Sequence, residues 1–173
     1  MSKNALFLDR DGVINIDHGY VHKKENFDFI DGIFDLVGNA NKKGYLIVVV
    51  TNQAGIGRGL YTEEIFHSLT NWMIKKFFDN GSRIDRVYFS PYHPEFGIGK
   101  YRKVSNCRKP APGMILQAKK DLNIDLEKSL LIGDSLKDME AAKAAGVGKS
   151  LFFRKDNNKI QSDKSFIQIN NLR

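Results

Sequence analysis

The sequence ALFLDRDGVIN at residues 5–15 places a short apolar stretch directly before two carboxylates, Asp9 and Asp11. The apolar residues predict a buried strand over residues 4–8, and Gly12 allows the chain to turn sharply after it. Open α/β sheets hold their chemistry at the carboxyl ends of their strands. Two carboxylates there can bind a divalent cation, and one can attack a substrate while the other moves a proton. Acidic turns are also common on protein surfaces, so this motif indicates a site only if further motifs support it.

Apolar and amphipathic segments alternate along the whole chain, which predicts parallel strands joined by crossover helices. We therefore expect an α/β fold, a Rossmann-like parallel sheet flanked by helices, in a single domain over residues 1–173. Further strands are expected at residues 45–50, 87–89, 130–132 and 151–153. Helices are expected from Asp31 as N-cap to before Gly44, after Thr62, from Pro112 to about Leu122, and from Met139 to Ala145 with a stop at Gly146.

Two long segments without regular structure, residues 10–30 and 91–110, begin just after predicted strands. Loops of this length in a compact domain usually serve function, so we expect both to overhang the site. The glycines of residues 54–59 match neither the dinucleotide nor the P-loop spacing. We interpret them as a flexible turn, with Arg58 as a surface charge.

Composition narrows the classes of partner. The 173 residues are 42% hydrophobic, carry a net charge of +7 in scattered lysines, and include one cysteine, Cys107. The longest strongly apolar run, residues 45–50, is far shorter than the ~20 residues of a membrane span. No secretory signal is visible, so we expect the protein in the cytoplasm. Because the lysines form no concentrated basic stripe, we expect no nucleic-acid partner. We also expect a monomer that does not bind a membrane. A modest positive field favours capture of a small anion.

Four polar segments follow predicted strands in chain order. They are Asp9 with Asp11, Thr51 with Asn52, Arg108 with Lys109, and Asp134 with Asp138. Each alone has a structural explanation, since Thr51 can end a strand and Asp134 can cap a helix. In this order the four resemble the haloacid dehalogenase (HAD) superfamily of phosphohydrolases, and the resemblance covers essentially the whole chain. It implies a HAD-like sheet and a magnesium-dependent phosphatase.

The resemblance also implies a role for each residue. Asp9 would attack phosphorus to form an aspartyl phosphate, and Asp11 would protonate the leaving alkoxide. Thr51 and Lys109 would stabilise the phosphoryl oxygens. Mg²⁺ would be held by Asp9, the main-chain carbonyl of Asp11, and Asp134, while Asp138 would orient Lys109 or a water.

A narrower resemblance rests on residues 9–15, 17–22, 51–56 and 107–110, which are similar to the family of D-glycero-D-manno-heptose-1,7-bisphosphate 7-phosphatases. That family lacks a large cap domain and acts in heptose synthesis for surface polysaccharides such as lipopolysaccharide. The resemblance implies a sugar-phosphate substrate, with Arg108 on the phosphate that is not cleaved. The residues implied to contact the rest of the substrate are Asp17, His18, Gly19, Tyr20, Asn52 and Gln53. For His22 we prefer a hydrogen bond to the backbone.

The chain departs from this family at a zinc site. Members commonly carry C-x-H and, just before the Arg-Lys pair, C-x-C in the loop that corresponds to residues 91–110. At these positions this sequence has Ser90, Tyr92, Ser105 and Cys107. A structural zinc needs four good donors, and serine is a poor substitute for a thiolate. We therefore expect no zinc, and expect Tyr92, Phe96, Tyr101 and Val104 to order the loop by packing.

Three other functions remain open at this point. Histidinol-phosphate phosphatases share many of the same residues, and the positive charge allows a nucleic-acid 3′-phosphatase. A receiver-type phospho-accepting module also uses acidic residues, Thr or Ser, Lys and magnesium. In receivers, however, the accepting Asp lies on a middle strand, whereas here Asp9 and Asp11 follow the first strand.

Overall fold

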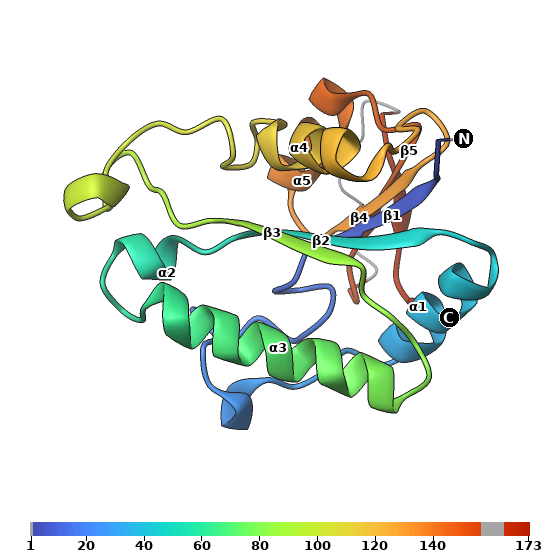
Figure 1. The fold of residues 1–173 in the computed structure, drawn as a ribbon, viewed down its shortest axis with the longest axis horizontal. Coiled ribbons are helices and arrows are strands. Elements are labelled where there is room, and N and C mark those ends of the chain that lie inside the picture. The colour runs from blue at the N-terminus through green and yellow to red at the C-terminus, as the bar shows by residue number, and fades with distance from the viewer. Residues whose placement is uncertain (1, 157–164) are drawn as a thin grey trace.

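The computed structural model describes residues 2–156 and 165–173, and its centre is a six-stranded parallel sheet in the order β3-β2-β1-β4-β5-β6 (Figure 1). The predicted α/β class is confirmed, and the described residues contain no large cap domain. The strands are β1 (Ala5–Leu8), β2 (Leu46–Asn52), β3 (Arg86–Ser90), β4 (Leu130–Gly133), β5 (Lys149–Phe153) and β6 (Ile167–Ile169). The α-helices are α1 (Ile33–Lys42), α2 (Ala54–Gly57), α3 (Glu63–Asp79), α4 (Gly113–Leu122) and α5 (Leu136–Ala145).

Helices cover both faces of this sheet. Leu6 and Leu8 of β1 face a core shared with α1 and α3, whereas Ala5 and Phe7 face a second core shared with α4 and α5. Figure 1 shows α4 and α5 on one side of the sheet and α1 and α3 on the other. Because every β1 side chain is buried, the strand has no polar position, and its continuous apolar run is typical of a central parallel strand.

The start of α1 differs from the prediction. The N-cap is Gly32, with φ +84°, and not Asp31. The Asp31 carboxylate instead lies 2.7 Å from Arg173 Nη2 near the chain's end, a contact between residues far apart in sequence. The predicted N-cap of α3 is confirmed, since Thr62 Oγ1 accepts a hydrogen bond from the backbone of Ile65.

Three elements extend or correct the sequence analysis. Residues 54–57 form the short helix α2, with Gly55, Ile56 and Gly57 buried, so interpreting them as a flexible turn was wrong. Strand β6 was not predicted, because its three residues give too short a pattern. Helix α5 begins at Leu136, earlier than predicted, because the side chain of Asp138 caps its first turn.

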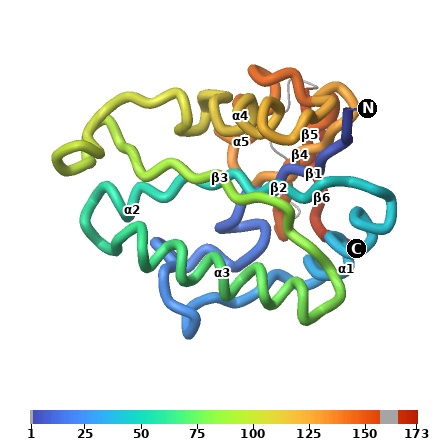
Figure 2. Tube along the Cα trace, viewed as in Figure 1, coloured from blue at the N-terminus to red at the C-terminus, as the bar shows by residue number. Residues whose placement is uncertain are grey.

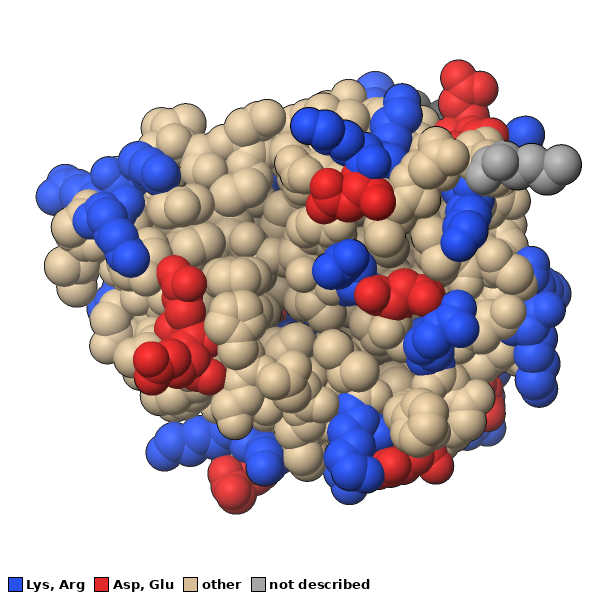
Figure 3. Space-filling view, in the orientation of Figure 1, with Lys and Arg blue, Asp and Glu red and all other residues tan. Residues whose placement is uncertain are grey.

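The two long segments lie beyond the carboxyl edge of the sheet. Residues 10–30 contain one 3₁₀ turn, Lys24–Asn26, and the segment between β3 and α4 contains another, Gly99–Tyr101. In Figure 2 the second segment extends past the sheet to lie near α2. None of the described helices is both long and apolar enough to cross a bilayer. Lysine and arginine lie in separate groups interspersed with acidic residues on the face shown in Figure 3.

The two helix starts give a matched test of the capping assignments. Thr62→Ala should lower the free energy of unfolding by about 1 kcal/mol, because it removes an acceptor for a backbone N–H of α3. Asp31→Ala should change it by less than about 0.5 kcal/mol, because it removes only an exposed ion pair. Urea unfolding of both variants measures the difference. Equal losses would contradict the N-cap assignments.

Candidate active site

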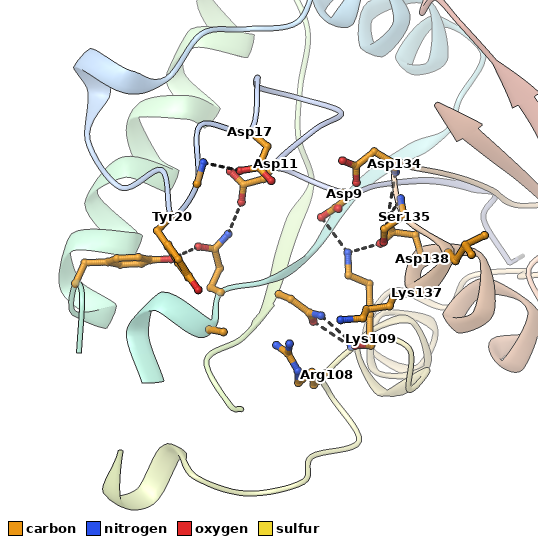
Figure 4. A pocket seen from close by; sticks show the side chains of 16 residues that line it. Asp9, Asp11, Asp17, Tyr20, Arg108, Lys109, Asp134, Ser135, Lys137 and Asp138 are labelled. Carbon is orange, nitrogen blue, oxygen red and sulfur yellow. Dashed lines mark hydrogen bonds and ion pairs between the residues drawn. The ribbon is translucent and has the colours of Figure 1, made fainter. Parts of the chain in front are cut away.

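The carboxyl ends of β1, β2 and β4 surround a cavity of about 670 Å³ (Figure 4). Its walls come from the turn after β1, from α2, from the loop before α4 and from the start of α5. The residues that line it are Asp9, Asp11, Asp17, Gly19, Tyr20, Asn52, Gln53, Ala54, Tyr61, Arg108, Lys109, Asp134, Ser135, Leu136, Lys137 and Asp138. The structure therefore brings together most of the residues that the sequence analysis singled out.

Lys109 lies at the centre of this arrangement. Its Nζ is 2.9 Å from Asp9 Oδ1, 2.6 Å from Asp138 Oδ1 and 2.9 Å from the main-chain oxygen of Val50. An ammonium has three hydrogens, and here each has an acceptor. The side chain is 4% exposed, so Lys109 ties two carboxylates together in a nearly dry environment.

The backbone of Lys109 is also fixed. Asn52 at the end of β2 donates from Nδ2 to the Lys109 oxygen and accepts from the Lys109 nitrogen through Oδ1, both at 3.0 Å. Both ends of the Asn52 amide are therefore engaged with Lys109. Although Asn52 lines the cavity, the contacts it makes in this structure position the lysine.

Burial and charge shift the pKa values of these groups. Burial lowers the pKa of Lys109, but Asp9 and Asp138 more than reverse this, so the net shift is upward. Burial, and then the neighbouring Asp138, raise the pKa of Asp9 well above its ordinary value despite the opposing charge of Lys109. The same two causes raise the pKa of Asp134 to about 6. Three carboxylates around one ammonium leave an excess of negative charge that favours a cation.

Asp138 is held by the start of α5. Its Oδ2 accepts hydrogen bonds from the Asp134 and Ser135 nitrogens at 3.1 Å and from Ser135 Oγ at 2.9 Å. Gly133 makes room for this carboxylate, since a Cβ there would lie 2.3 Å from that of Asp138. Asp138 therefore orients Lys109, one of the two roles expected for it.

Asp9, Asp134 and Asp138 form a group whose ligand oxygens lie within 4.8 Å of one another, as a divalent cation requires. A Cβ at Gly12 would lie 1.8 Å from Asp134 Oδ2, so only glycine allows Asp134 to approach this turn. Because Asp138 is already engaged by Lys109 and the helix start, Asp9 and Asp134 are the better ligands. All of these donors are oxygens, which suits Mg²⁺.

The carboxylate of Asp11 is fixed by a second set of contacts. Arg10, only 2% exposed, donates to Asp11 Oδ1 from Nε at 3.3 Å and Nη2 at 2.9 Å, and Nη2 also reaches the Val21 oxygen at 2.6 Å. Asn15 donates to the same Oδ1 at 3.0 Å, and Gln53 Nε2 donates to Oδ2 at 3.0 Å. Arg10 therefore links Asp11 to the loop of residues 10–30.

Two of the predicted site residues do not line the cavity. Thr51 is buried, and its Oγ1 accepts a hydrogen bond from Gln53 Nε2 at 2.8 Å. His18 is half exposed, and its Nε2 lies 2.7 Å from Asp28 Oδ2. The position of His18 does not support the expected substrate contact. The nearby His22 bonds to the Tyr20 oxygen through Nδ1, as expected for a backbone contact.

Three residues of the site, Tyr61, Arg10 and Lys137, were not predicted from the sequence. Tyr61 follows the glycine-rich segment, and its hydroxyl donates a hydrogen bond to Gln53. No local pattern predicts this contact. Arg10 resembles a surface charge in sequence but is among the largest fully buried side chains. Lys137 lines the cavity from the first turn of α5, and in the sequence it resembles any surface lysine.

Arg58 is exposed, as predicted, and it also joins the two long segments. Its Nη1 donates to the Tyr20 hydroxyl at 2.7 Å, and its guanidinium lies 4.9 Å from the centre of the Phe96 ring. The Ile98 nitrogen also donates to the Gly57 oxygen at 2.7 Å, and the Tyr101 hydroxyl donates to Glu63. Val104 is 86% exposed, so the prediction that it helps order this loop by packing was wrong.

The positions that correspond to the zinc ligands lie together without a set of metal donors. The sulfur of Cys107 is 3.0 Å from Ser105 Oγ and 3.5 Å from Ser90 Oγ. The main-chain oxygen of Tyr92 accepts a hydrogen bond from Arg108 Nη1 at 3.3 Å. One thiol and two hydroxyls form a small hydrogen-bonded cluster at the base of the loop.

Comparison with known proteins agrees with this geometry. Residues 106–161 match the HAD-hydrolase-like family model. The chain is 57% identical over 151 residues to the D-glycero-alpha-D-manno-heptose-1,7-bisphosphate 7-phosphatase of Burkholderia mallei, covering 87% of this chain and 80% of that protein. It is 53% identical over 154 residues to the beta-anomer enzyme of Vibrio cholerae, covering 89% and 83%.

A solved structure is also similar. The D,D-heptose 1,7-bisphosphate phosphatase of B. bronchiseptica, complexed with magnesium and phosphate, superposes with a TM-score of 0.84 at 26% identity, over 98% of this chain and 93% of that one. The identities to the curated relatives extend over most of both sequences, and the carboxylates and the buried lysine lie at the carboxyl edge of the sheet. The chain is therefore a phosphoric monoester hydrolase that belongs to the heptose-1,7-bisphosphate 7-phosphatase family of the HAD superfamily.

Proposed function

We propose that this protein removes the C7 phosphate of D-glycero-D-manno-heptose 1,7-bisphosphate in a magnesium-dependent reaction. The observation that carries the proposal is the single cavity that unites Asp9, Asp11, Lys109 and Asp134, in a chain whose relatives bear that activity in their names. The reaction would serve heptose synthesis in the cytoplasm for surface polysaccharides such as lipopolysaccharide.

The cation would be held by carboxylate oxygens of Asp9 and Asp134 and by the main-chain carbonyl of Asp11. When bound, Mg²⁺ supplies positive charge that neutralises the phosphoryl oxygens and the clustered carboxylates. The close approach of Asp134 to Gly12 and the excess negative charge of the site support this ligand set.

The reaction would proceed by two phosphoryl transfers. Asp9 attacks phosphorus and forms an aspartyl phosphate, while Asp11 gives a proton to the leaving C7 oxygen. Asp11 then takes a proton from the water that cleaves the intermediate. Lys109 keeps Asp9 in place and adds positive charge beside the reacting phosphorus, where such charge is most effective. The family resemblance assigns a phosphoryl oxygen to Thr51, whose buried Oγ1 accepts from Gln53 Nε2 and keeps its own hydrogen to donate.

The rest of the substrate would occupy the other side of the cavity. Arg108 is assigned to the phosphate that is not cleaved, because its forked donors suit a phosphate group. Asp17, Gly19 and Tyr20 line the same cavity and would contact the sugar hydroxyls, with Tyr20 held by Arg58. A volume of about 670 Å³ is ample for a sugar bisphosphate.

A comparison of substrates tests the proposal. With Mg²⁺, kcat/KM for phosphate release from heptose 1,7-bisphosphate should exceed that from histidinol phosphate or a 3′-phosphorylated oligonucleotide by about 100-fold or more, because the site is built for polar groups that those substrates lack. Both anomers belong in the assay, since the relatives are named for different ones. Chelation should abolish release, and Asp9→Asn should abolish it without lowering the melting temperature.

Each alternative gives its own result in this assay. Faster release from histidinol phosphate would reject the heptose substrate. Unchanged release by Asp9→Asn would reject Asp9 as the nucleophile. A stable phosphorylated protein that never releases phosphate would identify a receiver-type module instead.

We also propose that the loop between β3 and α4 needs no structural zinc. Its contacts to α2 and to the start of α3, through Arg58, Gly57 and Glu63, would hold it in place without a metal. Ser90 and Ser105 stand where the resemblance places thiolates, and hydroxyls bind zinc poorly.

Protein purified without added zinc should therefore contain far less than one equivalent when its metals are measured by mass spectrometry. The triple variant Ser90→Cys, Tyr92→His, Ser105→Cys restores the missing donors and should retain about one equivalent, which controls for zinc lost during purification. One equivalent of tightly bound zinc in the unmodified protein would contradict the proposal.

A further inference from the structure

Gln53, the first residue after β2, uses its whole side-chain amide within the protein. Its Nε2 donates one hydrogen to Asp11 Oδ2 at 3.0 Å and the other to Thr51 Oγ1 at 2.8 Å, while its Oε1 accepts from the Tyr61 hydroxyl at 2.5 Å. The residue is 2% exposed. Although it lines the cavity, both of its amide hydrogens are engaged within the protein, so neither is left for a substrate hydroxyl.

Tyr61 helps to fix which way this amide points. A phenol is a good donor to a carbonyl oxygen, so its hydroxyl selects the Oε1 end of Gln53 and directs Nε2 toward Asp11. Burial raises the pKa of Tyr61 to about 12, so the hydroxyl keeps its hydrogen at neutral pH. The ring of Tyr61 stacks on His22 at 4.9 Å between centroids and fits against Gly55, where a Cβ would lie 2.3 Å from the ring.

The two oxygens of Asp11 are consequently unequal. Oδ1 accepts from Arg10 Nε, Arg10 Nη2 and Asn15 Nδ2, whereas Oδ2 accepts from Gln53 alone. A carboxylate oxygen offers two lone pairs, so Oδ1 is saturated and Oδ2 retains one that a proton can occupy.

We propose that Tyr61 and Gln53 form a positioning relay that makes Oδ2 of Asp11 the oxygen that carries the transferred proton. The inference rests on the proposed function of Asp11 as the acid. In the first transfer the O–H bond at Oδ2 breaks as the proton moves to the leaving alkoxide, whose bond to phosphorus breaks while Asp9 bonds to phosphorus. In the second, Oδ2 takes the proton of the attacking water as the bond between phosphorus and Asp9 breaks. Tyr61 touches no reacting atom and acts only through Gln53.

The relay can be tested through the leaving group. The C7 alkoxide needs a proton to leave, whereas 4-nitrophenolate leaves without one, so loss of acid positioning should affect only the first substrate. Since general acid catalysis supplies ~10²–10⁴, Tyr61→Phe should lower kcat/KM for heptose 1,7-bisphosphate about fivefold and Gln53→Met about 50-fold. Both variants should lower kcat/KM for 4-nitrophenyl phosphate much less than for the heptose substrate, because that reaction shares the contact of Gln53 with Thr51 but needs no acid. The ratio of the two kcat/KM values should therefore fall, whereas a general loss of structure would lower both values together.

Tyr88→Phe is the matched control, because it also removes one tyrosine hydrogen bond, to Asp121 Oδ2 at 2.8 Å, but lies outside the cavity lining. It should leave both substrates unaffected. Equal losses on both substrates, or no loss on either, in the folded Tyr61→Phe and Gln53→Met variants would overturn the relay. Absence of phosphate release by the unmodified protein from both substrates would instead overturn the proposed function.

Discussion

The ammonium of Lys109, shared between the carboxylates of Asp9 and Asp138, is the constraint on which the rest of the site depends. Burying three carboxylates so close together is costly unless a cation compensates them. Lys109 supplies that charge from a loop outside the sheet, and Asn52 holds its backbone at the end of β2. One side chain therefore joins the ends of β1, β2 and β4 electrostatically, and the remaining negative charge favours a divalent metal.

Asp9 and Asp11, two residues apart, are kept in different environments by separate contacts. Asp9 faces Lys109 and Asp134 on one side of the turn, while Asp11 faces Arg10, Asn15 and Gln53 on the other. This separation suits a reaction in which one carboxylate attacks and its neighbour moves a proton.

Local patterns in the sequence were sufficient for the first five strands of the sheet and for the polar residues at strand ends. The run at residues 45–50 and the Asp9–Asp11 pair carry their own signal, because burial and turn geometry act within a few residues. The contacts that were missed join distant segments: Arg10 with Val21, Tyr61 with Gln53, and Arg58 with Phe96. No local pattern relates the segments that these contacts join, and Arg10, Gln53 and Tyr61 are buried only by tertiary packing. The N-cap of α1 was wrong for a related reason, since Asp31 contacts the chain's end instead of the helix.

The free energy of unfolding of Lys109→Met, measured in urea with a chelator present, tests the compensating role of Lys109 most directly. The account predicts a loss of about 3–5 kcal/mol at neutral pH, because the variant leaves buried carboxylates without their cation. Adding Asp138→Asn should recover part of that loss, since one of the uncompensated charges is removed. If Lys109→Met unfolds at the same urea concentration as the unmodified protein, the ammonium does not hold the site together.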